Sequence, residues 1–423
     1  MQLVIDLYFV IMVLFYTFVL TTVFSSMYVE RRTTSDYMAM TTQEPLVYFF
    51  LIPCIDEDQV IQETVTRLCS FNFDGQVIVI DDGSTDRTAD CVRQVKDARV
   101  SLHQRQLPNA QQGKGEALND ALQLVLATCQ EQQLAPERVV IGVLDADAYL
   151  SNNALDAVAK SFYFEGSTAV QLRVKMKAPF KNALQVAQDA EFFTINNYDQ
   201  IARKLFQSVG LSGNGQFFRL KPILDRIGKR PWGRALLDDY ELTLKLMIKH
   251  LKVDYVADAY VYQEALFSIP RLIKQRSRWV QGNLDCLKYV KPLWKEGHLR
   301  KSQWVSILYF LTQPYLNLVS DSVIIILFSD MIYRFVTVPN TNWLNSGLLL
   351  LGVFGASLVL GVIFTLNYRK TLRHFHEDVP PKRHLMVLPL FVSYMYVILF
   401  FSIILAFYRK LMKQNDWIKT KRN

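Results

Sequence analysis

Pairs of carboxylates follow apolar runs in this chain, and their spacing suits chemistry on a diphosphate. Asp145 and Asp147 flank one alanine directly after residues 139–144, and Asp81 and Asp82 precede a glycine after another apolar run. Two acids at the end of a buried strand are unfavourable without a partner. A Mg²⁺ or Mn²⁺ ion that bridges carboxylates to a diphosphate would be such a partner. The pattern predicts a metal-assisted site for a diphosphate-bearing substrate.

A further acidic pair and a cationic, aromatic segment complete the set. Asp238 and Asp239 form the pair, and residues 275–279 read Gln-Arg-Ser-Arg-Trp. A carboxylate whose pKa lies near the ordinary ~4 is ionised at neutral pH and can accept the proton of an attacking hydroxyl. Guanidinium groups can bind a departing diphosphate in bidentate fashion. The ordered set predicts transfer of a group from a diphosphate to an acceptor.

Each member of the set also has a structural interpretation. Asp145 and Asp147 could cap the helix that follows them, and Asp238 could cap another. Residues 268–289 have the pattern of an amphipathic helix, and such a helix can lie at a membrane surface. Capping by Asp238 explains one acid of its pair but not Asp239. We therefore favour a functional use of the whole set.

The elements that must position these residues alternate between short apolar runs and helical patterns. Strands are expected at residues 47–53, 76–80 and 139–144, and a helix at residues 57–69. This alternation predicts an α/β domain with a mostly parallel sheet and covering helices. Ligands of such sheets gather at the carboxyl ends of the strands, where the acids fall. Lys114, between two glycines, opens another expected helix and can reach a phosphate or a base.

An apolar stretch near the N-terminus predicts a membrane anchor. The chain has 423 residues, 51% of them hydrophobic, and residues 7–28 carry no charge. That stretch is long enough to cross ~30 Å of hydrocarbon as one helix. No basic residue precedes it, which argues against a cleavable signal peptide. Because Arg31 and Arg32 follow it directly, the positive-inside rule places the next domain in the cytoplasm.

Further apolar stretches predict about three more transmembrane helices. They are residues 304–333, 343–368 and 385–408. Asp321 and Asp330 interrupt the first of them, and Pro314 should bend or end a helix there. An intramembrane carboxylate could line a polar path for sugar, or lie near a helix end. We predict four spans with both chain ends outside, although the basic segments 369–383 and 409–422 compete for the inner side.

The predicted domains follow from these boundaries. They are an anchor over residues 1–30, a cytoplasmic α/β domain over 31–302, a membrane region over 303–408 and a basic tail over 409–423. The five cysteines include no Cys-x-x-Cys pair, so neither a disulfide framework nor a zinc site is indicated. We expect a multi-pass protein of the cell membrane and no nucleic-acid partner.

Together the acidic pairs, the lysine loop and the Gln-Arg-Ser-Arg-Trp segment resemble the processive family 2 glycosyltransferases, the membrane synthases of poly-N-acetylglucosamine, hyaluronan, cellulose and chitin. The resemblance covers roughly residues 46–288. It implies a GT-A domain that transfers a sugar from a UDP-sugar, with UDP-N-acetylglucosamine preferred, to a growing polysaccharide. The reaction would invert the anomeric carbon, need Mg²⁺ or Mn²⁺, and be coupled to export. Accessory membrane or export subunits are left open.

The resemblance also implies a role for each candidate residue. Asp239 would be the catalytic base and Asp147 the direct metal ligand. Expected at the nucleotide sugar are Asp56, Glu57, Asp81, Asp82, Lys114, Asp145, Arg276 and Arg278. Expected at the acceptor are Gly213, Asn214, Gly215, Asp238, Gln275 and Trp279, of which the tryptophan suits stacking on a pyranose ring. The chain departs from the family at Asp56, where Asn is usual, and at Asp238, where Glu is usual.

Two other functions fit parts of this pattern. A non-processive glycolipid synthase would share the catalytic set, but such relatives commonly lack the Gln-x-x-Arg-Trp segment. A catalytically inactive protein that only binds a nucleotide sugar would not need Asp239 together with the metal acids. Product size distinguishes the first alternative, and turnover distinguishes the second.

Overall fold

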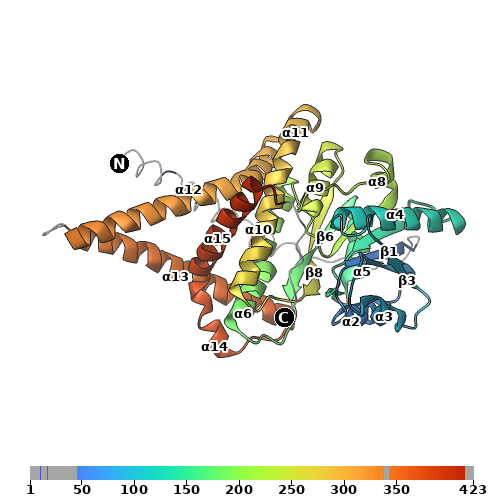
Figure 1. The fold of residues 1–423 in the computed structure, drawn as a ribbon, viewed down its shortest axis with the longest axis horizontal. Coiled ribbons are helices and arrows are strands. Elements are labelled where there is room, and N and C mark those ends of the chain that lie inside the picture. The colour runs from blue at the N-terminus through green and yellow to red at the C-terminus, as the bar shows by residue number, and fades with distance from the viewer. Residues whose placement is uncertain (1–9, 11–16, 18–44, 338–342, 415–423) are drawn as a thin grey trace.

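The computed structural model describes residues 10, 17, 45–337 and 343–414. The predicted anchor over residues 1–30 lies outside the described residues, apart from residues 10 and 17. An α/β part and a group of long helices make up the molecule (Figure 1).

The sheet of the described chain has eight strands in the order β3-β2-β1-β4-β7-β6-β8-β5. The strands are β1 Val47–Cys54, β2 Asp74–Asp81, β3 Val100–Gln104, β4 Val139–Val143, β5 Tyr149–Leu150, β6 Ala169–Met176, β7 Gln216–Arg219 and β8 Val253–Gln263. Pairing is parallel from β3 through β4 and between β6 and β8. It is antiparallel on both sides of β7 and between β5 and β8. The prediction of a mostly parallel sheet is confirmed.

Strand β1 shows why its sequence is apolar throughout. Phe50 and Ile52 face one hydrophobic core, and Phe49 and Leu51 face a second core on the other side of the sheet. Successive strand residues point to opposite faces, so a strand covered on both sides needs an unbroken apolar run.

Helices cover both faces of the sheet. Around the sheet lie α2 Ile61–Cys69, α3 Thr88–Arg93, α4 Lys114–Glu131, α5 Ala154–Phe164, α8 Leu220–Arg226 and α9 Asp238–Ile248. Val65 of α2 and Phe162 of α5 pack in the first core, whereas Leu118 and Leu122 of α4 pack in the second. The helix expected at residues 57–69 starts later than predicted, at Ile61.

Two amphipathic helical segments join the α/β part to the long helices. One consists of α6 Ala183–Ala190, a π-helix Glu191–Asn196 and α7 Asn197–Phe206. The other is α10 Ile269–Cys286, which starts after Ser268 with a proline in its first turn, as predicted. A 3-10 turn Leu287–Tyr289 and α11 Val290–Glu296 follow it.

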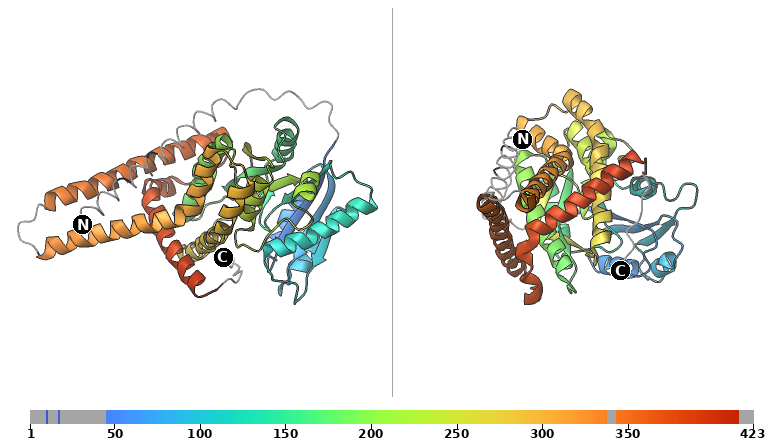
Figure 2. Two further views of the ribbon diagram at one scale, coloured as in Figure 1. Left: turned by 90° about the horizontal axis from the view of Figure 1, so that it is seen from above. Right: turned by 60° about the vertical axis from the view of Figure 1, so that its left-hand side comes forward.

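The long helices lie on one side of the α/β part, and two of them, α12 and α13, extend away from it (Figures 1 and 2). They are α12 Lys301–Thr337, α13 Trp343–His374 and α15 Phe391–Leu411, with the short α14 Lys382–Leu385 and a 3-10 turn Leu388–Leu390 before α15. Helix α12 does not end at Pro314, which lies inside it. Helix α15 packs along α10.

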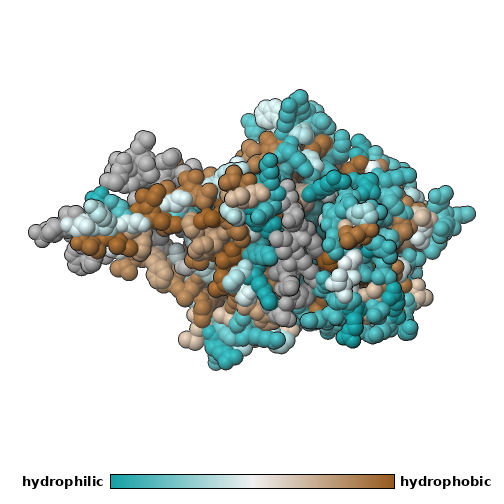
Figure 3. All heavy atoms as spheres, viewed as in Figure 1, coloured by the Kyte–Doolittle hydropathy of each residue, from teal (hydrophilic) through white to brown (hydrophobic). Residues whose placement is uncertain are grey.

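Two helical segments of the described chain, Lys301–Arg334 and Tyr394–Leu411, are long and apolar enough to cross a membrane by length and composition. Hydrophobic surface is concentrated over the long helices, and hydrophilic surface covers the α/β part (Figure 3). The span predicted at residues 343–368 forms α13, which is not among the segments that meet this criterion. The four-span arrangement with both ends outside stays a prediction.

A buried polar cluster fastens α13 to the sheet. Lys175 of β6 forms an ion pair with Asp189 at 3.0 Å, and both side chains are almost fully buried. The Tyr368 hydroxyl of α13 donates to the same carboxylate. Because removing one member would leave a buried charge unpaired, this cluster should fix α13 relative to the sheet.

Candidate functional site

A cavity of about 780 Å³ lies between the α/β part and the long helices. Asp145 and Asp239 belong to one wall, and Phe310, Phe364 and Leu399 of α12, α13 and α15 to another. All but three of the residues predicted for the site line this cavity. The exceptions are Asp56, Asp81 and Gly215. Residues from distant parts of the sequence therefore meet at one place.

Lys114 lies at the centre of the acidic residues. Gly113, with φ of 111°, precedes α4 and allows the chain to turn into that helix. The Lys114 Nζ atom lies 2.6 Å from Asp145 Oδ1 and donates to the carbonyl oxygen of Gly213 at 2.7 Å. Burial alone would lower the pKa of Lys114, but Asp145 and Asp238 raise it above its ordinary value. The ammonium group is thus held positive beside the acids.

The two acids at the start of α9 are buried in the cavity wall. Asp239 Oδ1 accepts a hydrogen bond of 2.6 Å from the backbone N–H of Tyr240, while Asp238 Oδ2 has no hydrogen-bond partner among the described residues. Burial raises the pKa of Asp239 to about 7, and the charge of Asp238 adds to the shift. Burial also raises the pKa of Asp238. The expected ordinary value of ~4 for Asp239 was therefore wrong.

This raised pKa predicts a pH dependence of activity. A base must be ionised, so if Asp239 has the base role that the resemblance implies, its protonation below about pH 7 should inactivate the free enzyme. We expect kcat/KM to rise as the pH increases toward 7 and to level off above it. Initial rates of UDP release between pH 5 and 9 would check this. A flat profile down to pH 5 would assign the base to a group with an ordinary carboxyl pKa.

Asp147 lies in the cavity wall in a position that suits a divalent ion. Its Oδ2 atom accepts a hydrogen bond of 2.8 Å from the backbone N–H of Glu264, which orients the carboxylate. Among the described residues, no group of three or more His, Cys, Asp or Glu side chains could hold a metal ion by itself. Mg²⁺ is commonly bound by one or two carboxylates together with substrate phosphates. Asp145 and Asp147 fit such a shared site.

The acids after β1 and β2 form a polar rim beside the cavity. Asp56, at φ of 49°, accepts a hydrogen bond of 2.8 Å from the backbone N–H of Thr85. Asp81 Oδ1 accepts one of 2.9 Å from the backbone N–H of Ser84. The first contact joins the loop after β1 to the loop after β2, and the second lies within the loop after β2. Asp56 and Asp81 support the rim, whereas Glu57 and Asp82 reach the cavity.

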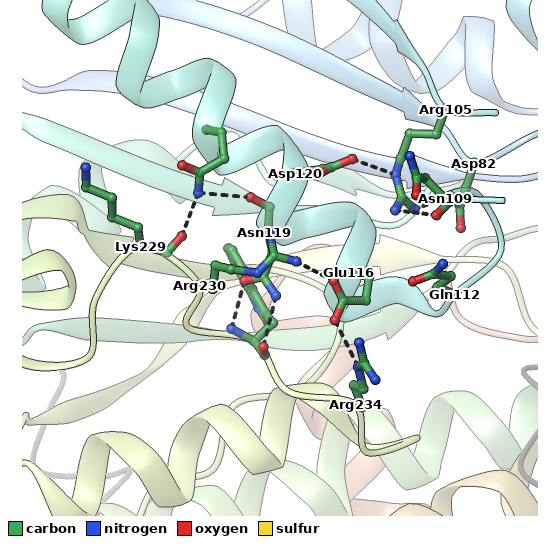
Figure 4. Close-up of polar contacts among 12 residues, drawn as sticks. Asp82, Arg105, Asn109, Gln112, Glu116, Asn119, Asp120, Lys229, Arg230 and Arg234 are labelled. Atoms are coloured by element: carbon green, nitrogen blue, oxygen red, sulfur yellow. Dashed lines mark hydrogen bonds and ion pairs between the residues drawn. The ribbon is translucent and has the colours of Figure 1, made fainter. Parts of the chain in front are cut away.

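Arg105 connects Asp82 to α4. Its guanidinium pairs with the buried carboxylate of Asp82 and, at 3.0 Å, with Asp120 of α4 (Figure 4). Burial raises the pKa of Asp82, and Arg105 opposes that shift. Arg105 was not predicted from the sequence, because only the fold brings it beside Asp82.

The segment before α9 is fastened to α4, as Figure 4 shows. Arg230 and Arg234 both pair with Glu116, and Asn119 exchanges hydrogen bonds of 3.0 and 3.2 Å with the backbone of Trp232. The same helix that carries Lys114 thereby sets the position of Asp238 and Asp239.

Helix α10 presents the cationic segment to the cavity. Gln275, Arg276, Arg278 and Trp279 all line it. Burial lowers the pKa of Arg278, and the carboxylates of Asp145 and Asp238 act against this shift. Arg278 therefore lies within electrostatic reach of the acidic site.

Arg276 has a different environment. Its guanidinium forms a buried ion pair of 2.8 Å with Glu191 and lies 4.3 Å from the ring centroid of Trp279. Phe192 contributes a second aromatic face at 5.0 Å. In this arrangement Arg276 fixes the Trp279 ring, and its expected contact with a diphosphate stays a prediction.

Glu191 was missed by the sequence analysis. It begins the π-helix, and π-helical turns often occur at functional sites. Burial raises the pKa of Glu191, whereas Arg276 lowers it. No local pattern marked it, because Asp189 and Asp199 are further acids of the same helical segment.

The loop before β7, at which acceptor contacts were predicted, lies beside Lys114 and Asp239. A Cβ atom at Gly213 would lie 3.2 Å from Lys114 Nζ and 3.3 Å from Asp239 Oδ2, so the glycine keeps these groups close together. Asn214 Oδ1 accepts a hydrogen bond of 3.2 Å from the backbone N–H of Asp145. Gly215, at φ of 70°, lies against Val261, which a Cβ atom would approach to 2.5 Å.

Gly215→Ala should therefore lower the free energy of unfolding by about 2 to 3 kcal/mol, because it adds a steric overlap to an unfavourable backbone conformation. Gly166→Ala is the matched control: φ is 60° there, but a Cβ atom would meet nothing within 4 Å in the part of the chain that the structure describes. We expect that control to cost about 1 kcal/mol. Chemical denaturation of the full chain in detergent measures both. Equal losses would contradict the packing argument.

A family model described as Glycosyltransferase like family 2 matches residues 45–282, more than half of the chain. The beta-monoglucosyldiacylglycerol synthase of Synechocystis sp. is 30% identical over 259 residues, which are 58% of this chain and 51% of that protein. The poly-beta-1,6-N-acetyl-D-glucosamine synthase of Staphylococcus aureus strain COL is 23% identical over 243 residues, 56% of this chain and 55% of that protein. The chain spans about half the length of these curated relatives.

A solved structure shares the fold over nearly the whole chain. It is a mannosyltransferase from Pyrobaculum calidifontis in complex with GDP-Man and Mn²⁺. The TM-score is 0.62 at 16% sequence identity, with 96% of this chain and 99% of that chain covered. The GT-A-like α/β fold expected from the sequence is thereby confirmed.

Proposed function

The chain belongs to glycosyltransferase family 2, and on this basis we propose that it transfers a sugar from a UDP-sugar to a hydroxyl of an acceptor held beside its long helices. The observation that supports this most is the shared cavity: the same 780 Å³ space borders Asp145, Asp239 and Arg278 and also α12, α13 and α15. A donor at the sheet edge and an acceptor from the helices could meet there.

The proposed reaction is a single displacement. Asp239 accepts the proton of the acceptor hydroxyl as that oxygen forms a bond to the anomeric carbon. The bond from that carbon to the diphosphate oxygen breaks, and its electron pair leaves with UDP. Lys114 and Arg278 offset the negative charge of the donor and of departing UDP. One displacement inverts the anomeric configuration.

Asp147, with Asp145, would hold a Mg²⁺ or Mn²⁺ ion against the diphosphate. When bound, such an ion adds positive charge at the leaving group. The support is the oriented carboxylate of Asp147 in the cavity wall, and the fold neighbour from Pyrobaculum calidifontis contains Mn²⁺.

A growing polysaccharide is the acceptor we favour, with export along the helices and UDP-N-acetylglucosamine as the donor. Trp279 supports this choice because its ring lies in the cavity wall and is held by Arg276. An immobilised aromatic ring suits stacking on a sugar. The similarity to poly-N-acetylglucosamine synthases points the same way.

A glycolipid is the second candidate. The glucosyldiacylglycerol synthases are more similar in sequence than the polysaccharide synthases, at 30% against 23% identity. Leu360, Phe364 and Leu399 give the cavity an apolar side on α13 and α15, which suits an acyl chain. Under this alternative the enzyme adds one sugar and stops.

The experiment that tests the proposal uses purified full-length enzyme with UDP-glucose, UDP-N-acetylglucosamine or UDP-galactose and Mg²⁺ or Mn²⁺. UDP release is measured together with the size and solubility of the product. We expect UDP release with at least one donor and a product of many sugars. No UDP release with any donor would contradict the proposal. A product extractable into organic solvent with one added sugar would favour glycolipid synthesis.

The substitution Trp279→Ala further distinguishes a polysaccharide acceptor from a lipid acceptor. Loss of ring stacking, worth roughly 1 kcal/mol or more, should shorten the products while UDP affinity is kept. Trp279→Phe should be intermediate, because a smaller ring remains. Product length is measured by gel filtration, and UDP affinity by calorimetry. Long polymer from the alanine variant would contradict a role of Trp279 in holding the growing chain.

A further inference from the structure

A ladder of polar side chains runs along one face of α12. Tyr309, Gln313, Asn317 and Asp321 follow one another at intervals of four residues, and all four line the cavity. Four-residue spacing keeps side chains on the same face of a helix. At a rise of ~1.5 Å per residue, the ladder is about 18 Å long.

The near end of this ladder lies beside the catalytic acids. Phe310, next to Tyr309, has its ring centroid 4.0 Å from that of Tyr240, and Tyr240 follows Asp239 directly. From there α12 extends away from the α/β part (Figure 1). The ladder therefore starts at the reacting centre and leads outward from it.

Asp321 is the member that the fold alone does not explain. Only 6% of the residue is exposed, it lines the cavity, and no hydrogen bond or ion pair reaches it from the described residues. A buried carboxylate without a partner is strongly unfavourable. Asp330, on the same helix, is exposed and paired with Arg334 at 2.7 Å. Asp321 is thus placed for a ligand that enters the cavity.

The other helical wall shows what kind of ligand fits. Leu360, Phe364 and Leu399 are apolar, so the occupant meets hydrogen-bonding groups on one side and hydrocarbon on the other. A sugar ring has hydroxyl groups at its edge and an apolar face. An acyl chain has no hydroxyl to donate to a carboxylate, and would leave Asp321 unpaired.

We propose that Gln313, Asn317 and Asp321 form an acceptor subsite that hydrogen-bonds a hydroxylated unit of the acceptor beyond the unit that accepts the new sugar. This subsite rests on the proposed glycosyl transfer and names its acceptor class as a glycan. Asp321 favours acceptors that have this further unit, because a carboxylate accepts hydrogen bonds from hydroxyl donors more strongly than an amide does.

The test measures the acceptor KM of the full-length enzyme, with the UDP-sugar that wild type uses best. The acceptors are oligosaccharides of one to five units of that sugar, and dioleoylglycerol in the same detergent. For wild type we expect the KM to fall as the oligosaccharide lengthens. Asp321→Leu should raise the KM of the longer acceptors about tenfold and that of the single sugar much less. Asp321→Asn should be intermediate.

Asp330→Asn is the matched control, since it removes an exposed carboxylate from the same helix, and its KM values should equal those of wild type. UDP affinity should be unchanged in every variant, which excludes misfolding as the cause. Equal effects of Asp321→Leu on short and long acceptors would overturn the subsite, as would dioleoylglycerol as the preferred acceptor. No transfer by wild type to any acceptor would instead overturn the proposed function.

Discussion

Replacing Asp239 by asparagine should lower turnover by about two to four orders of magnitude while UDP affinity is kept. Asparagine has the same shape but cannot accept the proton of the acceptor hydroxyl. The position makes the effect specific: Asp239 lines the cavity, and its Oδ2 atom faces the small space that Gly213 leaves beside Lys114. Turnover is measured by stopped assays of UDP release, and UDP affinity is measured by calorimetry.

The matched control for this change is Asp225→Asn. Asp225 is exposed on α8 and pairs only weakly, four residues along its helix, with Lys221. The turnover of the Asp225→Asn enzyme should equal that of wild type. If Asp239→Asn keeps near wild-type turnover, another acid is the base, and Asp238 would be examined next because it shares the same wall.

Replacing Asp147 by alanine should abolish the increase in UDP affinity that Mg²⁺ or Mn²⁺ gives wild type. Without this carboxylate, the ion would lose its direct protein ligand, and the diphosphate charge would be poorly compensated. UDP binding is titrated with and without the ion, so the readout does not depend on catalysis.

Asp90→Ala serves as the control for Asp147, because Asp90 is exposed and pairs with Arg93 on the surface. The UDP affinity of the Asp90→Ala enzyme should respond to the ion as that of wild type does. Wild-type UDP binding and turnover that are unaffected by a chelator would contradict the metal-assisted mechanism.

The sequence predicted the positions of elements better than the environments of side chains. The apolar run before Asp145 is β4, and the acids at 238 and 239 begin α9. Strand ends and helix starts can be predicted because they depend on the local sequence pattern. Lys114 opens α4 directly after Gly113, as the lysine loop indicated. These features depend on neighbours in the sequence.

Other features depend on contacts between distant segments and could not be predicted. The pKa of Asp239 reaches about 7 because α9 is buried, which the residue's own neighbours do not reveal. Arg276 lies against Glu191, which is 85 residues away. Pro314 was expected to bend or end its helix, and α12 does not end there. The cavity likewise depends on how α12, α13 and α15 pack against the sheet.

The measurement that tests the central claim most directly is acceptor-dependent release of UDP, with the anomeric configuration of the product determined by NMR. Purified wild type, one active UDP-sugar and an oligosaccharide of the same sugar should release one UDP for each glycosidic bond formed. The new bond should have the configuration opposite to that of the donor. Retained configuration, or UDP release that forms no glycosidic bond, would contradict a single displacement by an acceptor hydroxyl with Asp239 as its base.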